Sequence, residues 1–263
     1  MAGMTRLIAL AGGPASVRTV VDVGANDGAD SLPSAEDFPE IRFVAVEPTP
    51  ELAVALEEKS ADLENYTVVA CAIGLSDGDA HFHIRQSSVH NSIERVDEES
   101  VRAVGIAPEA YAVRERITVS MRRLDSLCRE LDIGAIDVLH VDAQGSDLDV
   151  LVSTGELLSS VRAGVVEVGR RLNLYANTTA RREAIDFLVR HGFRIVEVAP
   201  NDKWNYEQNV VFVRAGSRRG RRLEALVKMG RADVSHLAGI PARRLGTPLR
   251  LRVRKLGAML RGR

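Results

Sequence analysis

Two short runs of residues carry the chemistry that can be read most directly from this chain. Residues 19–28 read Thr-Val-Val-Asp-Val-Gly-Ala-Asn-Asp-Gly, an apolar run that ends in Asp22 and is followed by Gly24 and Gly28. A second apolar run, residues 43–46, ends in Glu47. Strand, glycine turn, helix, strand and acid is the order of elements that holds a nucleotide-type ligand at the carboxyl edge of a parallel sheet. We therefore predict a nucleotide-type site in this part of the chain.

The spacing of the glycines indicates which ligand is bound. A dinucleotide site requires Gly-x-Gly-x-x-Gly around a pyrophosphate, and here Asn26 stands where the middle glycine would be. The form Asp-x-Gly-x-x-x-Gly resembles the first motif of S-adenosylmethionine-dependent methyltransferases. We expect the Asp22 region to balance the cofactor's ammonium, Glu47 to accept its ribose hydroxyls, and the glycines to allow close backbone approach. The alternative is a tight turn between strand and helix that binds no ligand.

A second segment sharpens the resemblance. Residues 136–151 read Ile-Asp-Val-Leu-His-Val-Asp-Ala-Gln-Gly-Ser-Asp-Leu-Asp-Val-Leu. They resemble the hallmark of the FkbM-type methyltransferases, usually Lys-Ile-Asp-x-Glu-Gly-x-Glu before an apolar helix. Further segments resemble the family in the same order over roughly residues 19–213: Glu47-Pro48, Leu124-Asp125 and Glu167. His140 replaces the usual lysine and Gln144 the usual glutamate, so the catalytic base and the substrate do not carry over from the family.

The end of the fourth predicted strand carries the candidate catalytic residues, His140 and Asp142. Methyl transfer from a sulfonium requires in-line approach of a nucleophile, and a general base accelerates attack by an alcohol roughly 10²–10⁴-fold. Ligands of open α/β sheets bind at this edge. Histidine titrates near neutral pH, so we predict His140 as the base and Asp142 as a second catalytic residue. The alternative for His140 is a half-buried strand residue whose hydrogen bonds are satisfied.

Other candidates surround this edge. The predicted cofactor-binding residues are Asp22, Gly24, Asn26, Gly28, Glu47, Cys71, Ala72 and Asp142. The predicted substrate contacts are His90, Asn91, Glu167, Trp204 and Tyr206, with ordinary packing as the alternative for the aromatic residues and a solvated loop for His90 and Asn91. Asp142 with Asp125 or Glu167 offers carboxylates of the kind that Mg²⁺ prefers, although the sequence shows no compact ligand cluster.

The elements that must position these residues form an α/β fold. Apolar runs predict strands near 19–23, 41–46, 66–72, 136–141, 163–168, 193–198 and 209–213, with helices such as 50–59 and 179–191 between them. The resemblance implies the class-I methyltransferase fold, a Rossmann-like, mostly parallel seven-stranded sheet with helices on both faces and a final antiparallel hairpin. Residues 80–85 alternate as an added hairpin strand. We expect the polar residues 88–115 to form an irregular insert over the active site.

Length and composition agree with one such domain. The chain has 263 residues, of which 45% are hydrophobic, and its two cysteines do not indicate a disulfide scaffold. No run of 18 apolar residues predicts a membrane span, and the apolar run near the start is too short for a signal peptide. We therefore expect a cytoplasmic protein.

Charge divides the chain into two parts. From Arg214 onward there are 15 Lys and Arg against two acids, a net charge of +13, whereas residues 1–213 carry −14. We predict a methyltransferase domain over 1–213 and a basic extension over 214–263. Three alternatives are open for the extension. It binds nucleic acid or an anionic membrane, it lies on its own acidic body or on a partner subunit, or it is solvated.

The resemblance implies a function. We expect S-adenosylmethionine-dependent O-methylation of a sugar, glycan or related natural product, with a small-molecule or saccharide acceptor; a homodimer is compatible with it. One alternative is a nucleic-acid-binding methyltransferase that uses the basic extension, but the chain lacks an Asp/Asn-Pro-Pro-Tyr/Phe run and the extension lacks interleaved aromatics for base stacking, so we do not expect a nucleic-acid partner. The other alternative is a non-catalytic assembly subunit that retains the fold.

Overall fold

A seven-stranded sheet forms the centre of the protein. The computed structural model describes residues 3–94, 111–169, 181–201 and 207–215. In spatial order the strands are β3 (Tyr66–Val69), β2 (Arg42–Val46), β1 (Thr19–Val23), β7 (Val138–Val141), β8 (Ala163–Gly169), β10 (Glu207–Arg214) and β9 (Phe193–Pro200). Strands β3 to β8 in this order pair in parallel, and β10 runs antiparallel to both of its neighbours. The predicted class-I methyltransferase fold, with its final antiparallel hairpin, is confirmed.

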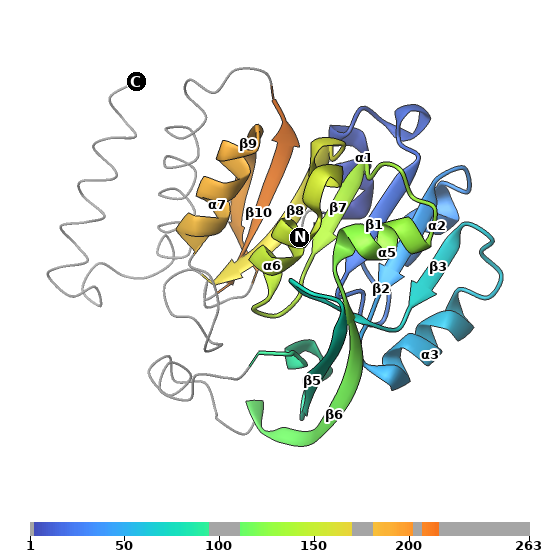
Figure 1. Cartoon of the computed structure of the whole chain (residues 1–263). Coiled ribbons are helices and arrows are strands. Elements are labelled where there is room, and N and C mark those ends of the chain that lie inside the picture. Colours follow the sequence, from blue (N-terminus) through green and yellow to red (C-terminus); the bar gives the residue numbers. More distant parts are fainter. Residues whose placement is uncertain (1–2, 95–110, 170–180, 202–206, 216–263) are drawn as a thin grey trace, which may run out of the picture.

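Helices cover both faces of this sheet, as predicted (Figure 1). The helices α1 (Met4–Leu10), α2 (Leu32–Asp37) and α3 (Pro50–Lys59) contribute to one apolar cluster, and α5 (Leu124–Glu130), α6 (Asp147–Ser153) and α7 (Arg181–Arg190) contribute to the other. Short 3₁₀ turns lie at η1 (Pro14–Ser16), η2 (Ser88–His90) and η4 (Gly155–Ser159). The sequence did not lead us to predict α1.

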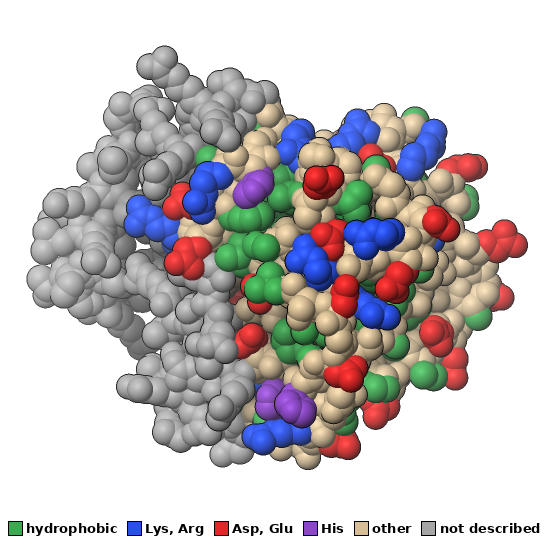
Figure 2. Space-filling model, viewed as in Figure 1, with side chains coloured by type: hydrophobic (Ala, Val, Ile, Leu, Met, Phe, Trp, Pro, Cys, Tyr) green, Lys and Arg blue, Asp and Glu red, His purple; other side chains and the backbone are tan. Residues whose placement is uncertain are grey.

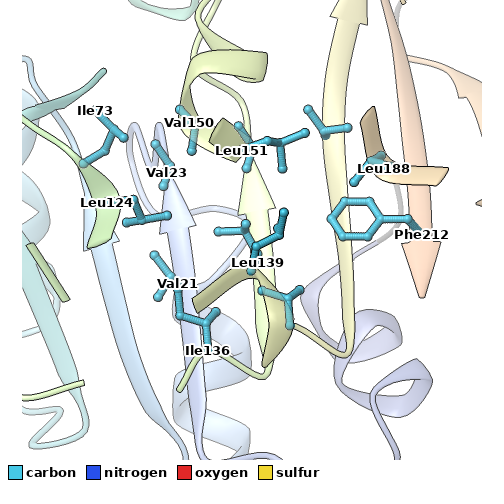
Figure 3. Packing of buried hydrophobic residues seen from close by; sticks show 14 of the residues in the cluster. Val21, Val23, Ile73, Leu124, Ile136, Leu139, Val150, Leu151, Leu188 and Phe212 are labelled. Carbon is cyan, nitrogen blue, oxygen red and sulfur yellow. The ribbon is translucent and has the colours of Figure 1, made fainter. Parts of the chain in front are cut away.

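The alternation of side chains along the strands explains the two clusters. In β1, Val21 and Val23 face α5 and α6, whereas Val20 faces α1. Leu139 of β7 lies at the centre of the first cluster (Figure 3), which α7 extends through Leu188. Asp22 follows the same alternation and therefore faces the α1 side, buried within the sheet.

Local signals set the helix ends. Helix α3 has the predicted bounds and begins at Pro50, whose fixed φ suits a first turn. Pro33 lies in the first turn of α2, so it starts that helix instead of breaking it. Gly192, just after α7, has a φ of +92°, a left-handed conformation that ends the helix.

A second, three-stranded sheet was only partly predicted. Its strands are β4 (Ala72–Ile73), β6 (Val113–Arg122) and β5 (Gly78–Arg85), in that order. The added hairpin strand expected at 80–85 is confirmed within β5, but the single strand expected at 66–72 is divided between β3 and β4. Residues 113–115 belong to β6, so the insert expected to be irregular over 88–115 contains η2 and the start of a strand. The charged, largely exposed side chains at the start of β6 hide the alternation that identifies a strand.

The last strand of the large sheet ends one residue beyond the domain boundary that was expected at residue 213. Arg214 is the last residue of β10, and its side chain donates to the carbonyls of Val161 and His191 and lies 3.9 Å over the ring of Phe193. Acidic and basic side chains are interspersed over the described body in Figure 2. Among the described helices, none combines the length and apolarity needed to cross a bilayer. Residues 216–263 of the basic extension lie outside the described residues.

Candidate active site

A cavity of about 350 Å³ lies at the carboxyl ends of β1, β2 and β7. This is the edge at which open α/β sheets bind ligands. Its described lining includes the glycine turn after β1, the acid after β2, residues 71–73, the η2 loop, the hallmark loop after β7 and two residues near β10, Asn201 and Glu207. The cavity thus brings together segments from the two halves of the sequence.

Gly24 begins the turn after β1 and has a φ of +84°, a conformation that favours glycine. A Cβ atom at this position would lie 1.9 Å from the carbonyl oxygen of Asp142. The glycine therefore allows the turn after β1 to pack directly against the loop after β7. Gly28 does not line the cavity: a Cβ there would meet Leu32 and Leu56 at 2.5 Å, so this glycine serves the packing of α2 and α3.

Glu47 lies at the end of β2 and is 5% exposed. One carboxylate oxygen accepts the backbone N–H of Asn26 at 2.9 Å, and the other accepts that of Thr49 at 2.8 Å. Burial raises the pKa of Glu47, and the hydrogen bonds from Thr49 and Asn26 act in the opposite direction. Each oxygen keeps a second lone pair, so Glu47 can fix the turn and still accept ribose hydroxyls.

The part of the cavity that is lined by the predicted cofactor residues fits S-adenosylmethionine. Six predicted cofactor residues line it: Gly24, Asn26, Glu47, Cys71, Ala72 and Asp142. Ser146 also lines the cavity, and its buried hydroxyl has no hydrogen-bond partner among the described residues, which leaves it available to a ligand. Asp22 is buried and does not line the cavity.

His140 does not occupy the position expected of a general base. It is 8% exposed and absent from the cavity lining, and its Nδ1 lies 2.9 Å from Oδ1 of Asp22. The contact is an ion pair when the imidazole is protonated. Burial alone would lower the pKa of His140, but the carboxylates of Asp22, Asp30 and Asp142 together raise it to about 9. His140 therefore lies against Asp22 and outside the cavity lining, so the structure gives no support to the role of general base predicted for it.

Asp142, Gln144 and Glu167 form a connected group at the cavity wall. The side-chain Nε2 of Gln144 donates to Oδ1 of Asp142 at 2.6 Å and to Oε2 of Glu167 at 2.9 Å. Asp142 and Gln144 line the cavity, whereas Glu167 is 3% exposed and lies behind them. The predicted position of Asp142 beside the cavity holds, but Glu167 does not reach the cavity as a substrate contact.

The η2 loop forms the opposite wall and contributes His90 and Asn91, as predicted. Arg85, which is 1% exposed, donates to the backbone carbonyls of His90 and Glu94, and its own N–H is accepted by Asn91. The ring of His90 stacks on Tyr111 at a centroid distance of 4.2 Å. A buried arginine and a stacked tyrosine therefore hold this wall in place.

The predicted magnesium site gains no support. Among the described residues, no three His, Cys, Asp or Glu side chains lie close enough together to hold a metal ion. Asp125 binds Arg123 through both carboxylate oxygens, and the amide of Gln144 donates to both Asp142 and Glu167.

Trp204 and Tyr206 lie outside the described residues.

Sequence reasoning missed several lining residues: Asp27, Asp30, Ile73, Phe82, Ser88, Val89, Ile93, Asn201 and Glu207. For Asp27 and Asp30 a signal existed, because both follow the glycine turn. Phe82 and Glu207 come from strands whose arrangement around the cavity only the folded chain reveals.

Comparisons with known proteins agree with this geometry. A family model described as the methyltransferase FkbM domain matches residues 22–195. The 2-O-methyltransferase NoeI of Sinorhizobium fredii is 27% identical over 185 residues, which cover 64% of this chain and 70% of NoeI. The AMB antimetabolite synthetase AmbE of Pseudomonas aeruginosa is 31% identical over 205 residues, 67% of this chain but 9% of that protein.

The structure of M. capricolum TrmK in complex with S-adenosyl-homocysteine aligns over 97% of this chain and 96% of that one, with a TM-score of 0.45 at 8% identity. Strand order, cavity position and the matched residues of the family model lead to one conclusion. The chain belongs to the FkbM family of S-adenosylmethionine-dependent methyltransferases.

Proposed function

We propose that this protein methylates a hydroxyl oxygen of a sugar, glycan or related natural product. The observation that carries the proposal is the placement of Asp142. It lies where the cofactor-binding turn meets the loop after β7, and it lines the same cavity as His90, Asn91 and Glu207. A carboxylate at this junction is placed to orient a hydroxyl and to accept its proton as attack proceeds.

The cofactor, when bound, supplies an electrophilic methyl group. Glu47 is placed to accept its ribose hydroxyls, and the residues beside Cys71 and Ala72 offer an apolar wall for its base. Asp22 lies against His140, outside the cavity lining. With these lining residues assigned to the cofactor, the η2 loop, Gln144, Asn201 and Glu207 remain to contact the acceptor.

The charge of the lining supports an uncharged, hydroxyl-rich acceptor. Five acidic residues line the cavity, Asp27, Asp30, Glu47, Asp142 and Glu207, and no Lys or Arg does so among the described residues. Carboxylates and amides bind hydroxyl groups well, whereas a phosphodiester would be repelled. The relative NoeI is named as a 2-O-methyltransferase, which agrees with transfer to oxygen.

A labelled-methyl transfer screen tests the proposal. Purified protein is incubated with radiolabelled S-adenosylmethionine and a panel of neutral sugars, oligosaccharides, polyketide alcohols, sugar phosphates and RNA, with mass analysis of each product. We expect label in a neutral hydroxylated acceptor, and we expect Asp142→Asn to abolish it while Asp149→Asn, a carboxyl outside the cavity, retains it. Label in RNA alone, with a steep dependence on salt, would replace the proposal with the nucleic-acid alternative. Failure to bind S-adenosylhomocysteine in calorimetry would instead favour a non-catalytic role.

A further inference from the structure

We propose that Asp142 and Glu167 act as one proton-sharing carboxyl pair, held together by Gln144, and that Asp142 passes the acceptor's hydroxyl proton into this pair. The inference rests on the proposed function and goes beyond it by assigning a role to two buried groups. In this scheme Asp142 is the catalytic residue, because it faces the cavity. Glu167 and Gln144 are positioning residues that act through it.

The geometry of Gln144 joins the two carboxyl groups. One amide nitrogen donates to both, at 2.6 Å to Asp142 and 2.9 Å to Glu167. Gln144 has a φ of +46°, a conformation that non-glycine residues seldom adopt, and its carbonyl accepts the hydroxyl of Ser92 at 2.6 Å. The strained backbone is thus anchored from the opposite wall of the cavity. Strain held in this way at a site is a signal of function.

The two carboxyl groups differ in access. Asp142 lines the cavity, and Glu167 is 3% exposed behind it. The second oxygen of Glu167 accepts the amide of Asn201, which itself accepts the amide of Asn209 on β10 at 3.0 Å. Glu167 therefore cannot touch an acceptor, but it can exchange a proton with Asp142.

The surrounding charges favour a shared proton. Burial, the charge of Asp142, the charge of Glu207 on β10 and a hydrogen bond with Asp142 raise the pKa of Glu167 well above its usual range. Asp147 of α6 adds to this, and burial and the charge of Asp142 raise its own pKa to about 7. On the other side of Asp142 lie Asp30 and the cation of His140. Loss of the last proton from the pair is therefore disfavoured, as in other carboxyl pairs.

The chemical step balances within this arrangement. The acceptor's O–H proton moves to the Asp142 carboxylate while the oxygen forms a bond to the methyl carbon. The carbon–sulfur bond breaks, and its electron pair stays on sulfur, which becomes a neutral thioether. The proton gained by the pair leaves later to solvent. The fully ionised pair is the stronger base, because repulsion between the two carboxylates raises their affinity for a proton.

The first arm of the test needs no acceptor. Protein labelled with ¹³C at the side-chain carboxyls of Asp and Glu is titrated by NMR, and the Asp142 and Glu167 signals are assigned by comparison with Asp142→Asn and Glu167→Gln. We expect the wild-type pair to titrate in two coupled steps, the upper one above the carboxyl range. In Glu167→Gln the upper step should be lost, because only one carboxyl of the pair remains. Independent, unshifted titration of both groups would overturn the proposal.

The second arm measures kcat against pH with an acceptor from the screen. In the wild type, kcat should rise with pH through the upper step of the pair. Glu167→Gln should move this rise to lower pH and reduce the plateau about tenfold or more, because the remaining base is weaker. Asp149→Asn, a half-buried carboxyl of α6 outside the cavity, should keep the wild-type profile. A Glu167→Gln profile that keeps the wild-type rise would also overturn the proposal.

These arms separate failure of the pair from failure of the proposed function. If no hydroxyl is methylated, the first arm still decides whether the carboxyls share a proton. Should Glu167→Gln not fold, Gln144→Glu provides a second variant, since a third carboxyl would raise the upper step further; an unchanged titration in that variant would overturn the proposal. Calorimetry with S-adenosylhomocysteine checks that each variant retains the cofactor site.

Discussion

The Nδ1 atom of His140 lies 2.9 Å from Oδ1 of Asp22, and the two residues are direct partners in the register of β1 and β7. Both are buried on the sheet face covered by α1, beneath the glycine turn. Adjacent parallel strands thus place a cation and an anion side by side under the cofactor-binding loop. This pair links the stability of the loop to the charge of one histidine.

We expect this pair to make stability depend on pH. The pKa of His140 is raised from 6.5 to about 9, so the folded state binds the proton more tightly than the unfolded state. The stabilisation is fully present below about pH 6.5 and is lost as pH rises through about 9, and its upper bound is roughly 3 kcal/mol. Urea unfolding from pH 6 to 10 should show this loss in the wild type. His140→Gln should lack it, and the control His81→Gln, at an exposed position, should retain it; equal pH dependence in all three would contradict the prediction.

Glu47 is expected to determine cofactor affinity. Glu47→Ala should weaken binding of S-adenosylmethionine or S-adenosylhomocysteine by roughly 1.5–3 kcal/mol, because hydrogen bonds to a charged group are lost. It also leaves the N–H groups of Asn26 and Thr49 without their acceptor. Calorimetry provides the measurement, with the exposed Glu51→Ala as control and with NAD expected not to bind. Wild-type affinity in Glu47→Ala would remove this residue from the site.

Gly24 is expected to tolerate no side chain. In Gly24→Ala, the new Cβ would meet the Asp142 carbonyl at 1.9 Å and the φ of +84° would be strained. We expect a loss of at least about 2 kcal/mol in the free energy of unfolding, together with loss of cofactor binding. Gly134→Ala is the matched control, since nothing lies within 4 Å of its Cβ position. Thermal unfolding with and without S-adenosylhomocysteine distinguishes them, and similar behaviour of the two variants would count against the packing described here.

The basic extension can be removed at two informative points. Truncation after Ala215 should leave cofactor affinity unchanged within a factor of a few, because the cavity is lined from the body. Truncation after Val213 also removes Arg214, whose side chain binds the carbonyls of Val161 and His191. That shorter form should lose about 1–3 kcal/mol of stability. Denaturant unfolding compares the two, and identical stabilities would show that Arg214 does not hold the edge of the sheet.

Solution mass and liposome pelleting test what the extension does. A mass that changes on truncation after Ala215 would show that the extension docks a partner subunit. Pelleting with anionic lipid at low salt would show membrane attachment, since screening is weakest there. Its absence would exclude the membrane alternative.

Much of the cofactor site follows from local sequence. Apolar runs bounded by glycine and acid predict strands and turns, and the order of such runs predicts a parallel sheet. Gly24, Asn26 and Glu47 therefore lie together because each follows the end of a strand, and the ends of parallel strands meet at one edge. Helix α3 was similarly predictable, since Pro50 marks its first turn.

The catalytic assignment was not available from sequence alone. Spacing predicts that His140 and Asp142 share a face of β7, but it does not reveal which neighbours that face meets. Only the register of β1 and β7 places Asp22 beside His140 and turns a predicted base into a buried cation. Burial and charge are properties of the packed molecule, because they depend on groups distant in sequence.

The sequence by itself determined the fold class, the family and the cofactor edge, since these depend on short patterns repeated along the chain. The tertiary structure alone decided that Gln144 bridges Asp142 and Glu167, because the two carboxyls are brought together by neighbouring strands and held by one residue in a strained conformation. It also decided that Ser92 meets the Gln144 carbonyl across 52 positions of sequence. Contacts of such separation arise from closure of the sheet and loops, which no local pattern encodes.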